Sequence, residues 1–366
     1  MATGSATQII DSDAHVVESE RTWDFLEPAE ERFRPLLVVA PNDPTLEYWV
    51  VENKIRGFRF RSLSEEEVAR LSAVSGKHLE DQRARREMDD VQLRLDHMDE
   101  LGIDVQVLHN TMWIEKVADT PDAEAALCRS WNRWLAKIWR DGGGRLRWSC
   151  VIPAQSIDEA LAQIKTASEN GAVAVCMRPL EGDRLISDPY FYPVYEQAQK
   201  LNLAIAVHIS NGNPESCDLY TSPVDPLSSN GFAKFRAPTV TACHTLLMSE
   251  LPILFPTLRW SFIEASAQWL PWIVREAAVR HQALGHPLPN DVLSRWRIYV
   301  TCQTEDDVPY LLKEGAGDTL MIGTDYGHFD PSSDNNAIAT FIATAGIEQD
   351  AMNKILYDNP KRLYGL

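Results

Sequence analysis

The sequence predicts an α/β protein folded as one (β/α)8 barrel, or TIM barrel, spanning residues 1–366 as a single domain. Three observations support this fold class: the chain length, eight short apolar segments, and helical patterns between those segments. A chain of 366 residues with 45% hydrophobic content is long enough to bury one large core. A doubly wound parallel sheet would show a similar alternation, and the closed barrel is the preferred of these two folds.

Each of the eight apolar segments is short, rich in Val, Ile or Leu, and free of regular polar alternation. Such segments are typical of parallel strands that are buried on both faces. We therefore expect strands at residues 8–17, 104–109, 146–152, 172–177, 203–208, 259–264, 297–302 and 319–325.

Amphipathic helical patterns fall between these strands. Met88, Val91, Leu95, Met98 and Leu101 recur at steps of three and four residues, which places them on one face of a helix. Similar patterns predict helices at residues 123–139, 157–167, 193–201, 270–283 and 306–314.

Two long segments interrupt the strand–helix alternation, residues 18–86 after the first strand and 210–236 after the fifth. The first is rich in aromatic and charged residues, and the second in Pro, Ser, Asn and Gly. Structureless loops of this length are usually lids or binding loops, and both follow the strand ends where a barrel keeps its active site. We expect these two insertions to form a substrate cap.

Composition excludes several classes of partner. The net charge of −18 disfavours nucleic acids and anionic membrane surfaces, because phosphates would be repelled. The sequence has neither a long apolar span nor a signal-peptide pattern, so we expect a cytoplasmic protein. Its six cysteines form no C-x-x-C pair, which argues against a thiolate zinc site and a disulfide framework.

Histidines and carboxylates gather at the ends of the predicted strands. In a parallel barrel these ends form one rim, and such side chains there are the ligands that a divalent transition metal needs. The residues are Asp13 and His15 (strand one), His109 (strand two), His208 (strand five), Glu264 (strand six) and Asp325 (strand eight). A single His at a strand end is more often a hydrogen-bonded structural residue, but the joint occurrence of Asp13, His15, His208 and Asp325 favours a metal site.

Several stretches carry a family resemblance: IIDSDAHVVE, HMDELGIDVQVL, NRWLAKI, DPYFYPVYEQAQKLNLAIAVHIS, FPTLRWSFIEASAQWLPW, IGTDYGH and ILYDNPKRLYGL. They resemble the amidohydrolase-related branch (amidohydrolase family 2) of the amidohydrolase superfamily, which includes aminocarboxymuconate semialdehyde and hydroxybenzoate decarboxylases. The resemblance implies a metal-binding (β/α)8 barrel. Its ligands map onto Asp13, His15, His208 and Asp325.

The chain departs from the family pattern at three places. The first ligand of the superfamily is usually His, or Glu in some decarboxylases, whereas this chain has Asp13. Glu264 stands at the end of strand six, where hydrolases and decarboxylases of this branch usually carry a catalytic His. Strand four, AVAVCMRP, lacks a lysine that bridges two metals after carbamylation in binuclear relatives. Hydrolysis by the usual machinery is therefore less favoured.

Additional donors suggest a second metal. His109, Glu264 and His244, in the segment TVTACHTLL, bring the donor set to seven, which is more than one metal uses. A mixed His and carboxylate set suits iron or manganese. This pattern resembles the dinuclear non-haem iron oxygenases of the same family. Each of the three extra residues also has a plainer reading: His109 as a substrate contact, His244 as a helix residue bonded to a backbone carbonyl, and Glu264 as a lone general base.

The leading hypothesis is an oxygenase with two divalent metals (iron, or iron and manganese) that hydroxylates a small organic substrate with dioxygen. Glu264 and His244 are its expected catalytic residues. Its electrons would come from an external reductant, because no G-x-G-x-x-G motif is present. The rival is a decarboxylase or hydrolase with a single zinc or manganese, in which Glu264 handles the proton. A third hypothesis is a non-catalytic barrel that partners an active subunit. A homodimer is compatible with all three.

Overall fold

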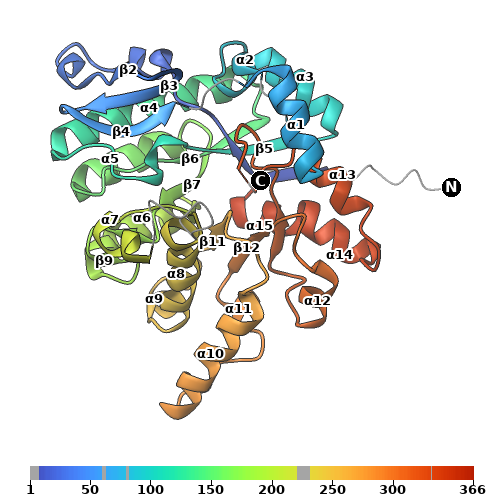
Figure 1. The fold of residues 1–366 in the computed structure, drawn as a ribbon. Coiled ribbons are helices and arrows are strands. Elements are labelled where there is room, and N and C mark those ends of the chain that lie inside the picture. The colour runs from blue at the N-terminus through green and yellow to red at the C-terminus, as the bar shows by residue number, and fades with distance from the viewer. Residues whose placement is uncertain (1–7, 60–62, 80–81, 221–230, 331) are drawn as a thin grey trace.

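Eight parallel strands form a closed barrel in the computed structural model, which describes residues 8–59, 63–79, 82–220, 231–330 and 332–366 (Figure 1). The strand order is β1-β5-β6-β7-β10-β11-β12-β13, with every pair parallel. A parallel bridge between Ala14 and Tyr326 joins the first strand to the segment after the last, and the backbone N–H of His15 donates to the carbonyl of Tyr326 at 2.8 Å. The predicted (β/α)8 barrel is confirmed.

All eight barrel strands lie within the segments predicted from apolar patterning. They are β1 (Ile10–His15), β5 (Val105–His109), β6 (Leu146–Cys150), β7 (Ala172–Met177), β10 (Ala204–His208), β11 (Trp260–Ile263), β12 (Ile298–Cys302) and β13 (Leu320–Ile322). Nearly every residue in them is buried, as expected for strands with a core on one face and helices on the other.

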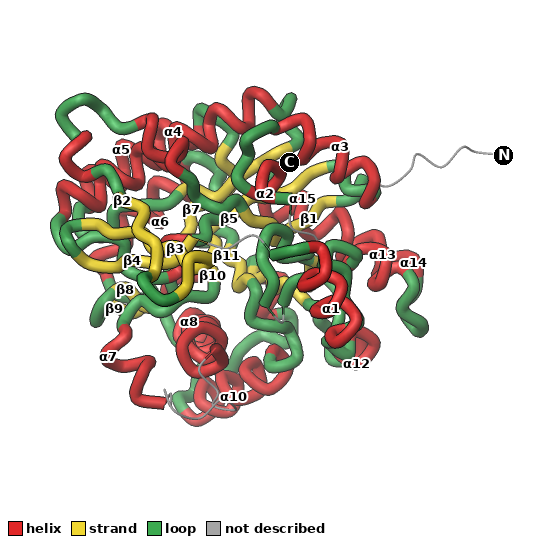
Figure 2. Tube along the Cα trace, turned by 45° about the horizontal axis from the view of Figure 1, so that its top comes forward, coloured by secondary structure: helices red, strands yellow, loops and turns green. Residues whose placement is uncertain are grey.

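Helices surround the strands, which occupy the middle of the molecule in Figure 2. The described helices are α1 (Glu65–Ser75), α2 (Arg83–Arg86), α3 (Val91–Leu101), α4 (Pro121–Asp141), α5 (Ile157–Ser168), α6 (Tyr192–Lys200), α7 (Pro214–Cys217), α8 (Ala237–Leu247), α9 (Leu251–Leu254), α10 (Leu270–Ala283), α11 (Val292–Arg295), α12 (Val308–Lys313), α13 (Ala337–Ile342), α14 (Gln349–Asn353) and α15 (Asn359–Tyr364). Within the described ranges, every helix is too short or too polar to cross a lipid bilayer.

The first insertion has regular secondary structure. It contains α1, α2 and a three-stranded antiparallel sheet of β2 (Leu36–Ala40), β3 (Asp43–Val51) and β4 (Lys54–Arg59). A small two-stranded sheet of β8 (Leu180–Glu181) and β9 (Arg184–Leu185) follows β7. β-branched and aromatic residues of the first insertion favour this antiparallel sheet, whose strands are largely exposed apart from residues such as Trp49 and Val51.

A row of tryptophans joins this sheet to the barrel. Trp49 of β3 packs edge-on against Trp23, with ring centroids 5.8 Å apart, and Trp23 lies 6.3 Å from Trp113. Trp113 contacts Trp131 of α4 at 5.9 Å, and Trp131 contacts Trp148 of β6 at 6.1 Å. Buried aromatic pairs of this kind add to the energy of area burial, so the insertion is a packed part of the fold.

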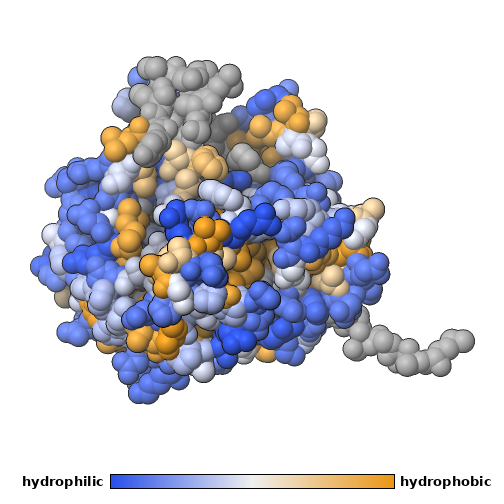
Figure 3. Space-filling model, turned by 90° about the horizontal axis from the view of Figure 1, so that it is seen from below, coloured by the Kyte–Doolittle hydropathy of each residue, from blue (hydrophilic) through white to orange (hydrophobic). Residues whose placement is uncertain are grey.

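Both insertions reach the barrel rim that bears the carboxyl ends of the strands. In the first, the carbonyl of His78 accepts a 2.8 Å hydrogen bond from the backbone of Asn335, which follows β13. In the second, Arg236 donates to the hydroxyl of Ser332 at 3.1 Å. Residues 60–62, 80–81 and 221–230 of the predicted cap lie outside the described residues. Figure 3 shows one face of the molecule, mostly hydrophilic with separate hydrophobic patches.

Candidate metal centre

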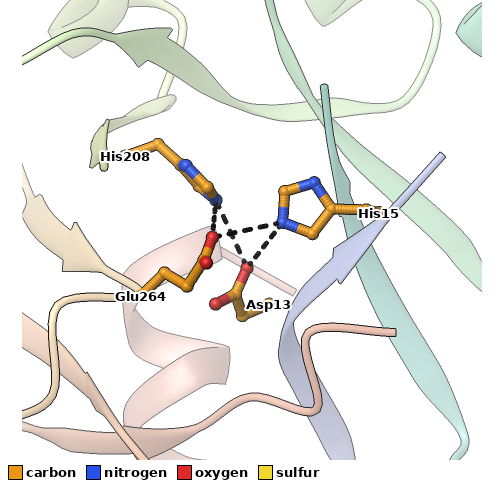
Figure 4. A group of neighbouring side chains, drawn as sticks. All are labelled: Asp13, His15, His208 and Glu264. Atoms are coloured by element: carbon orange, nitrogen blue, oxygen red, sulfur yellow. Dashed lines mark ion pairs between the residues drawn. The ribbon is translucent and has the colours of Figure 1, made fainter. Parts of the chain in front are cut away.

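Asp13, His15, His208 and Glu264, four of the predicted ligands, converge at one point on this rim (Figure 4). Asp325 forms an overlapping group with His15, Glu264 and His328. Asp13 and His15 lie two residues apart on β1, so both side chains point to the same face. His208 is the last residue of β10, Glu264 follows β11 directly, and Asp325 comes soon after β13. All five side chains are buried, each at most 3% exposed.

The separations between the donor atoms are short and nearly equal. Nε2 of His15 lies 3.4 Å from Oδ1 of Asp13, 3.6 Å from Oε2 of Glu264 and 3.4 Å from Oδ1 of Asp325. Nε2 of His208 lies 3.4 Å from Oδ1 of Asp13 and 3.3 Å from Oε2 of Glu264. Donors about 2.1 Å from one cation in a tetrahedral arrangement lie about 3.4 Å from one another. The cluster therefore has the dimensions of a site for a first-row divalent metal.

Hydrogen bonds fix the tautomer of both histidines. A carbonyl oxygen only accepts, so Nδ1–H of His15 donates to the carbonyl of Asn110 at 2.9 Å, and Nδ1–H of His208 donates to that of Ile209 at 3.2 Å. This leaves each Nε2 with a lone pair directed into the cluster, as metal-binding histidines require. Among the described residues, neither Nε2 nor Oδ1 of Asp13 has a hydrogen-bond partner.

The electrostatics also fit a cation. Burial lowers the pKa of His15 to about 4, so its imidazole is neutral near pH 7 and able to bind a metal. Burial and repulsion by Asp325 raise the pKa of Glu264 well above its usual value, and burial with repulsion by Asp330 does the same for Asp325. Several carboxyl groups that converge in a buried space are costly unless a positive charge joins them.

Two of these carboxylates lie on strained backbone. Glu264 has φ of +66° and Asp325 has φ of +49°, in the left-handed region that residues other than glycine rarely adopt. Each such conformation costs on the order of 1–3 kcal/mol and is often found at functional sites. At each of the two positions the backbone turns after the strand ends, and the turn directs the carboxylate into the cluster.

Gly323 leaves room for Asp13. A Cβ at position 323 would lie 2.3 Å from Cβ of Asp13, far inside any real contact. Gly323→Ala is therefore expected to destabilise the fold by roughly 1–3 kcal/mol through overpacking. Because Asp13 must shift, the variant should also lose about 10–100-fold in metal affinity, the range seen when the support of a ligand is disturbed.

Thermal unfolding and metal titration measure these two effects. Gly317→Ala is the matched control, because its nearest neighbour would be Cδ2 of Leu312 at an ordinary 3.5 Å. Equal metal affinity in the two variants would show that Asp13 does not depend on the space at Gly323.

His109 lies beside the cluster but is not placed as a ligand. Its ring centroid is 5.0 Å from that of His208, yet both of its nitrogens are engaged. Nε2–H donates to the carbonyl of Ser12 at 3.3 Å, and Nδ1 accepts from the hydroxyl of Ser149 at 2.9 Å. In this arrangement His109 supports the strands around the site.

His244 belongs to neither group of candidate metal ligands, which corrects its prediction as a ligand. It lies on α8, where the charges that act on it are Arg280 and Glu276 of α10, and it is only partly buried. The helical rotation of α8 turns His244 towards α10 rather than towards the rim.

The structure adds residues that the strand-end rule did not select. His328 stacks on His15 with ring centroids 4.0 Å apart, and its Nδ1 lies 2.9 Å from Oδ1 of Asp325. The hydroxyl of Ser333 donates to Oδ2 of Asp325 at 2.6 Å, and that of Ser332 donates to Oε1 of Glu264 at 3.2 Å. All three come from the loop after β13, and the spacing of His328, three residues after Asp325, is the one sequence feature that indicates a position beside a ligand.

Comparison with known proteins identifies the family. The amidohydrolase family model matches residues 10–366, which is nearly the whole chain. The chain belongs to the amidohydrolase family. The resemblance seen in the sequence is confirmed at this level, and the protein is an enzyme of the amidohydrolase superfamily with a buried candidate site for the divalent metals that the family binds. A comparison with curated protein sequences found no significant match.

Solved amidohydrolase-like structures share the fold. A Mycobacterium avium subsp. paratuberculosis amidohydrolase has a TM-score of 0.78 at 17% identity, with 99% of both chains covered. A 5-carboxyvanillate decarboxylase from Sphingomonas paucimobilis has a TM-score of 0.66 at 16% identity, covering 99% of this chain and 100% of that one. The 5-carboxyvanillate decarboxylase from Novosphingobium aromaticivorans, solved with manganese, has a TM-score of 0.66 at 15% identity, covering 99% and 97%. These similarities concern the fold; none of the three proteins is named as an oxygenase.

Proposed function

We propose that this protein is a mononuclear metal-dependent lyase or hydrolase that uses zinc or manganese without dioxygen. The observation that carries the proposal is the convergence of Asp13, His15, His208 and Glu264 on one centre, with Oδ1 of Asp325 3.4 Å from Nε2 of His15. Similar folds named as decarboxylases, one of them in complex with manganese, support this reading over the oxygenase hypothesis.

One metal fits the donor set better than two. The candidate ligands form two overlapping groups, one with Asp13 and His208 and the other with Asp325 and His328, and both His15 and Glu264 belong to each. The Nδ1–H of His15 is bonded to Asn110, so its Nε2 has one lone pair and binds one cation only. His109 and His244, which the two-metal hypothesis needed, are engaged or turned away.

Four of these residues would bind the metal, and Glu264 would transfer a proton. Asp13, His15, His208 and Asp325 would hold the cation, which supplies Lewis-acid polarisation of a bound oxygen atom when present. Oε2 of Glu264 lies within the same donor cluster, 3.3 Å from Nε2 of His208, while Ser332 holds Oε1, so Glu264 would face both the cation and a substrate atom that gains or loses a proton beside it. The two insertions, which contact the rim at Asn335 and Ser332, would cover the substrate.

The dinuclear oxygenase is the second candidate. Its support is the second donor group, in which His328 joins Asp325, Glu264 and His15. Asp325 and Glu264 each have two oxygens, and a carboxylate is able to bridge two metals.

A metal count combined with oxygen uptake separates the two candidates. Protein purified after expression with zinc, manganese or iron supplied in turn is expected to hold about one metal per chain and to consume no dioxygen, as a Lewis-acid site would. Two irons per chain with reductant-dependent oxygen uptake would establish the oxygenase instead. Absence of any bound metal would overturn both.

A further inference from the structure

Arg236 is a positively charged residue close to the candidate metal centre. This residue ends the π-helical segment Phe232–Arg236, which leads into α8. Its Nη2 donates to the hydroxyl of Ser332 at 3.1 Å, and that hydroxyl donates in turn to Oε1 of Glu264 at 3.2 Å. The guanidinium is thus two hydrogen bonds from the carboxylate that faces the metal. Short π-helical segments within helices are frequently found at functional sites.

Among the described residues, most N–H donors of Arg236 are not engaged in a hydrogen bond. A guanidinium carries five N–H groups, and the bond to Ser332 uses one of them. Among the described residues, no carboxylate lies within ion-pair distance of Arg236, although the sequence has 53 acidic residues. The neighbouring Lys234 differs in this respect, because its Nζ pairs with Oδ1 of Asp218 at 3.2 Å.

The negative charge of the carboxylates at the metal centre gives a positively charged side chain nearby a role in binding an anionic substrate. When a divalent cation keeps Asp13, Glu264 and Asp325 ionised, their three negative charges outweigh its two positive ones, and Asp330 lies close enough to repel both Glu264 and Asp325. An anionic substrate would therefore meet net repulsion unless a cationic side chain joined it. Arg86 is enclosed, at 1% exposure, with its guanidinium over the ring of Phe329. Arg236 is only partly buried and lies on the insertion that contacts the rim.

We propose that Arg236 binds a carboxylate of the substrate beside the metal centre, so that the substrate class is a small organic acid. The planar fork of the guanidinium pairs with both oxygens of a carboxylate, which orients the acid as well as attracting it. This assignment rests on the proposed function for its metal centre, but it concerns binding of an anion and is measured separately from turnover.

The test is calorimetric titration of the manganese-loaded protein with benzoate, a monocarboxylate probe, and with benzamide, its uncharged counterpart. Arg236→Met is expected to weaken benzoate binding at least about tenfold, which corresponds to losing one charge-assisted contact. Benzamide binding should change less than threefold. Arg236→Lys should give an intermediate loss, since lysine keeps the charge but not the fork.

Two controls isolate the role of Arg236. Lys234→Met removes one positive charge from the same π-helical segment and should leave the benzoate affinity unchanged. Ser332→Ala breaks the hydrogen-bond chain to Glu264 and should cost less than Arg236→Met. The proposal is overturned if Arg236→Met binds benzoate as the unaltered protein does, if benzamide binding falls equally, or if Ser332→Ala has the same effect. Manganese content and melting temperature, measured on each variant, identify misfolding, and a metal-free preparation would count against the proposed function rather than against the anion site.

Discussion

His208→Ala is expected to abolish stable metal binding and, with it, activity. His208 supplies an unpartnered Nε2 that lies 3.3–3.4 Å from Glu264 and Asp13, and alanine offers no donor to replace it. The loss of metal affinity should be at least about 100-fold, because disturbing an outer partner of a ligand alone costs about 10–100-fold. Equilibrium dialysis followed by elemental analysis measures this loss directly.

His244→Ala is the matched control for that experiment. Both variants remove one imidazole, but His244 lies between α8 and α10 with Arg280 and Glu276 as its charged neighbours. It should retain the metal content and turnover of the unaltered protein. Metal loss from His244→Ala, or full metal content in His208→Ala, would contradict the site assembled here.

Glu264→Gln is expected to separate metal binding from chemistry. The amide keeps the shape of the side chain and an oxygen donor but removes the group that carries a proton. The turnover number should fall by about 10²–10⁴-fold, the usual contribution of a positioned acid or base. The metal content should stay near one per chain.

Ser332→Ala provides the comparison for Glu264. It removes the hydrogen bond that holds Oε1 but keeps the carboxylate, so turnover should fall much less than in Glu264→Gln. Loss of one of two metals in Glu264→Gln would support the dinuclear oxygenase. Unchanged turnover would exclude Glu264 from the proton step.

The sequence predicted the barrel and the core of the site because both depend on local patterns. Buried parallel strands are short and apolar whatever their neighbours, and their carboxyl ends meet on one rim by topology. Asp13, His15, His208 and Asp325 could therefore be grouped without coordinates. Glu264 was found for the same reason, since it directly follows β11.

Other features depend on packing that the sequence does not encode locally. The identity of His244 does not reveal that α8 turns it towards α10, and the strand-end position of His109 does not reveal that Ser12 and Ser149 occupy both of its nitrogens. Arg236 ends a π-helical segment and Ser332 lies in the loop after β13, far apart in the chain, and no sequence pattern predicts that they meet. Long-range packing alone brings them together.

Three of the candidate ligands, Asp13, His15 and Asp325, lie where the first and last strands of the barrel meet. Asp13 and His15 belong to the first strand, Asp325 follows the last, and the backbone N–H of Asp325 donates to the carbonyl of Asp13 at 2.8 Å. A cation bound by both carboxylates would link the first strand of the barrel to the segment after the last strand. Metal binding is thus coupled to closure of the barrel. A nascent chain would have all of its metal ligands in place only after its last strand had paired.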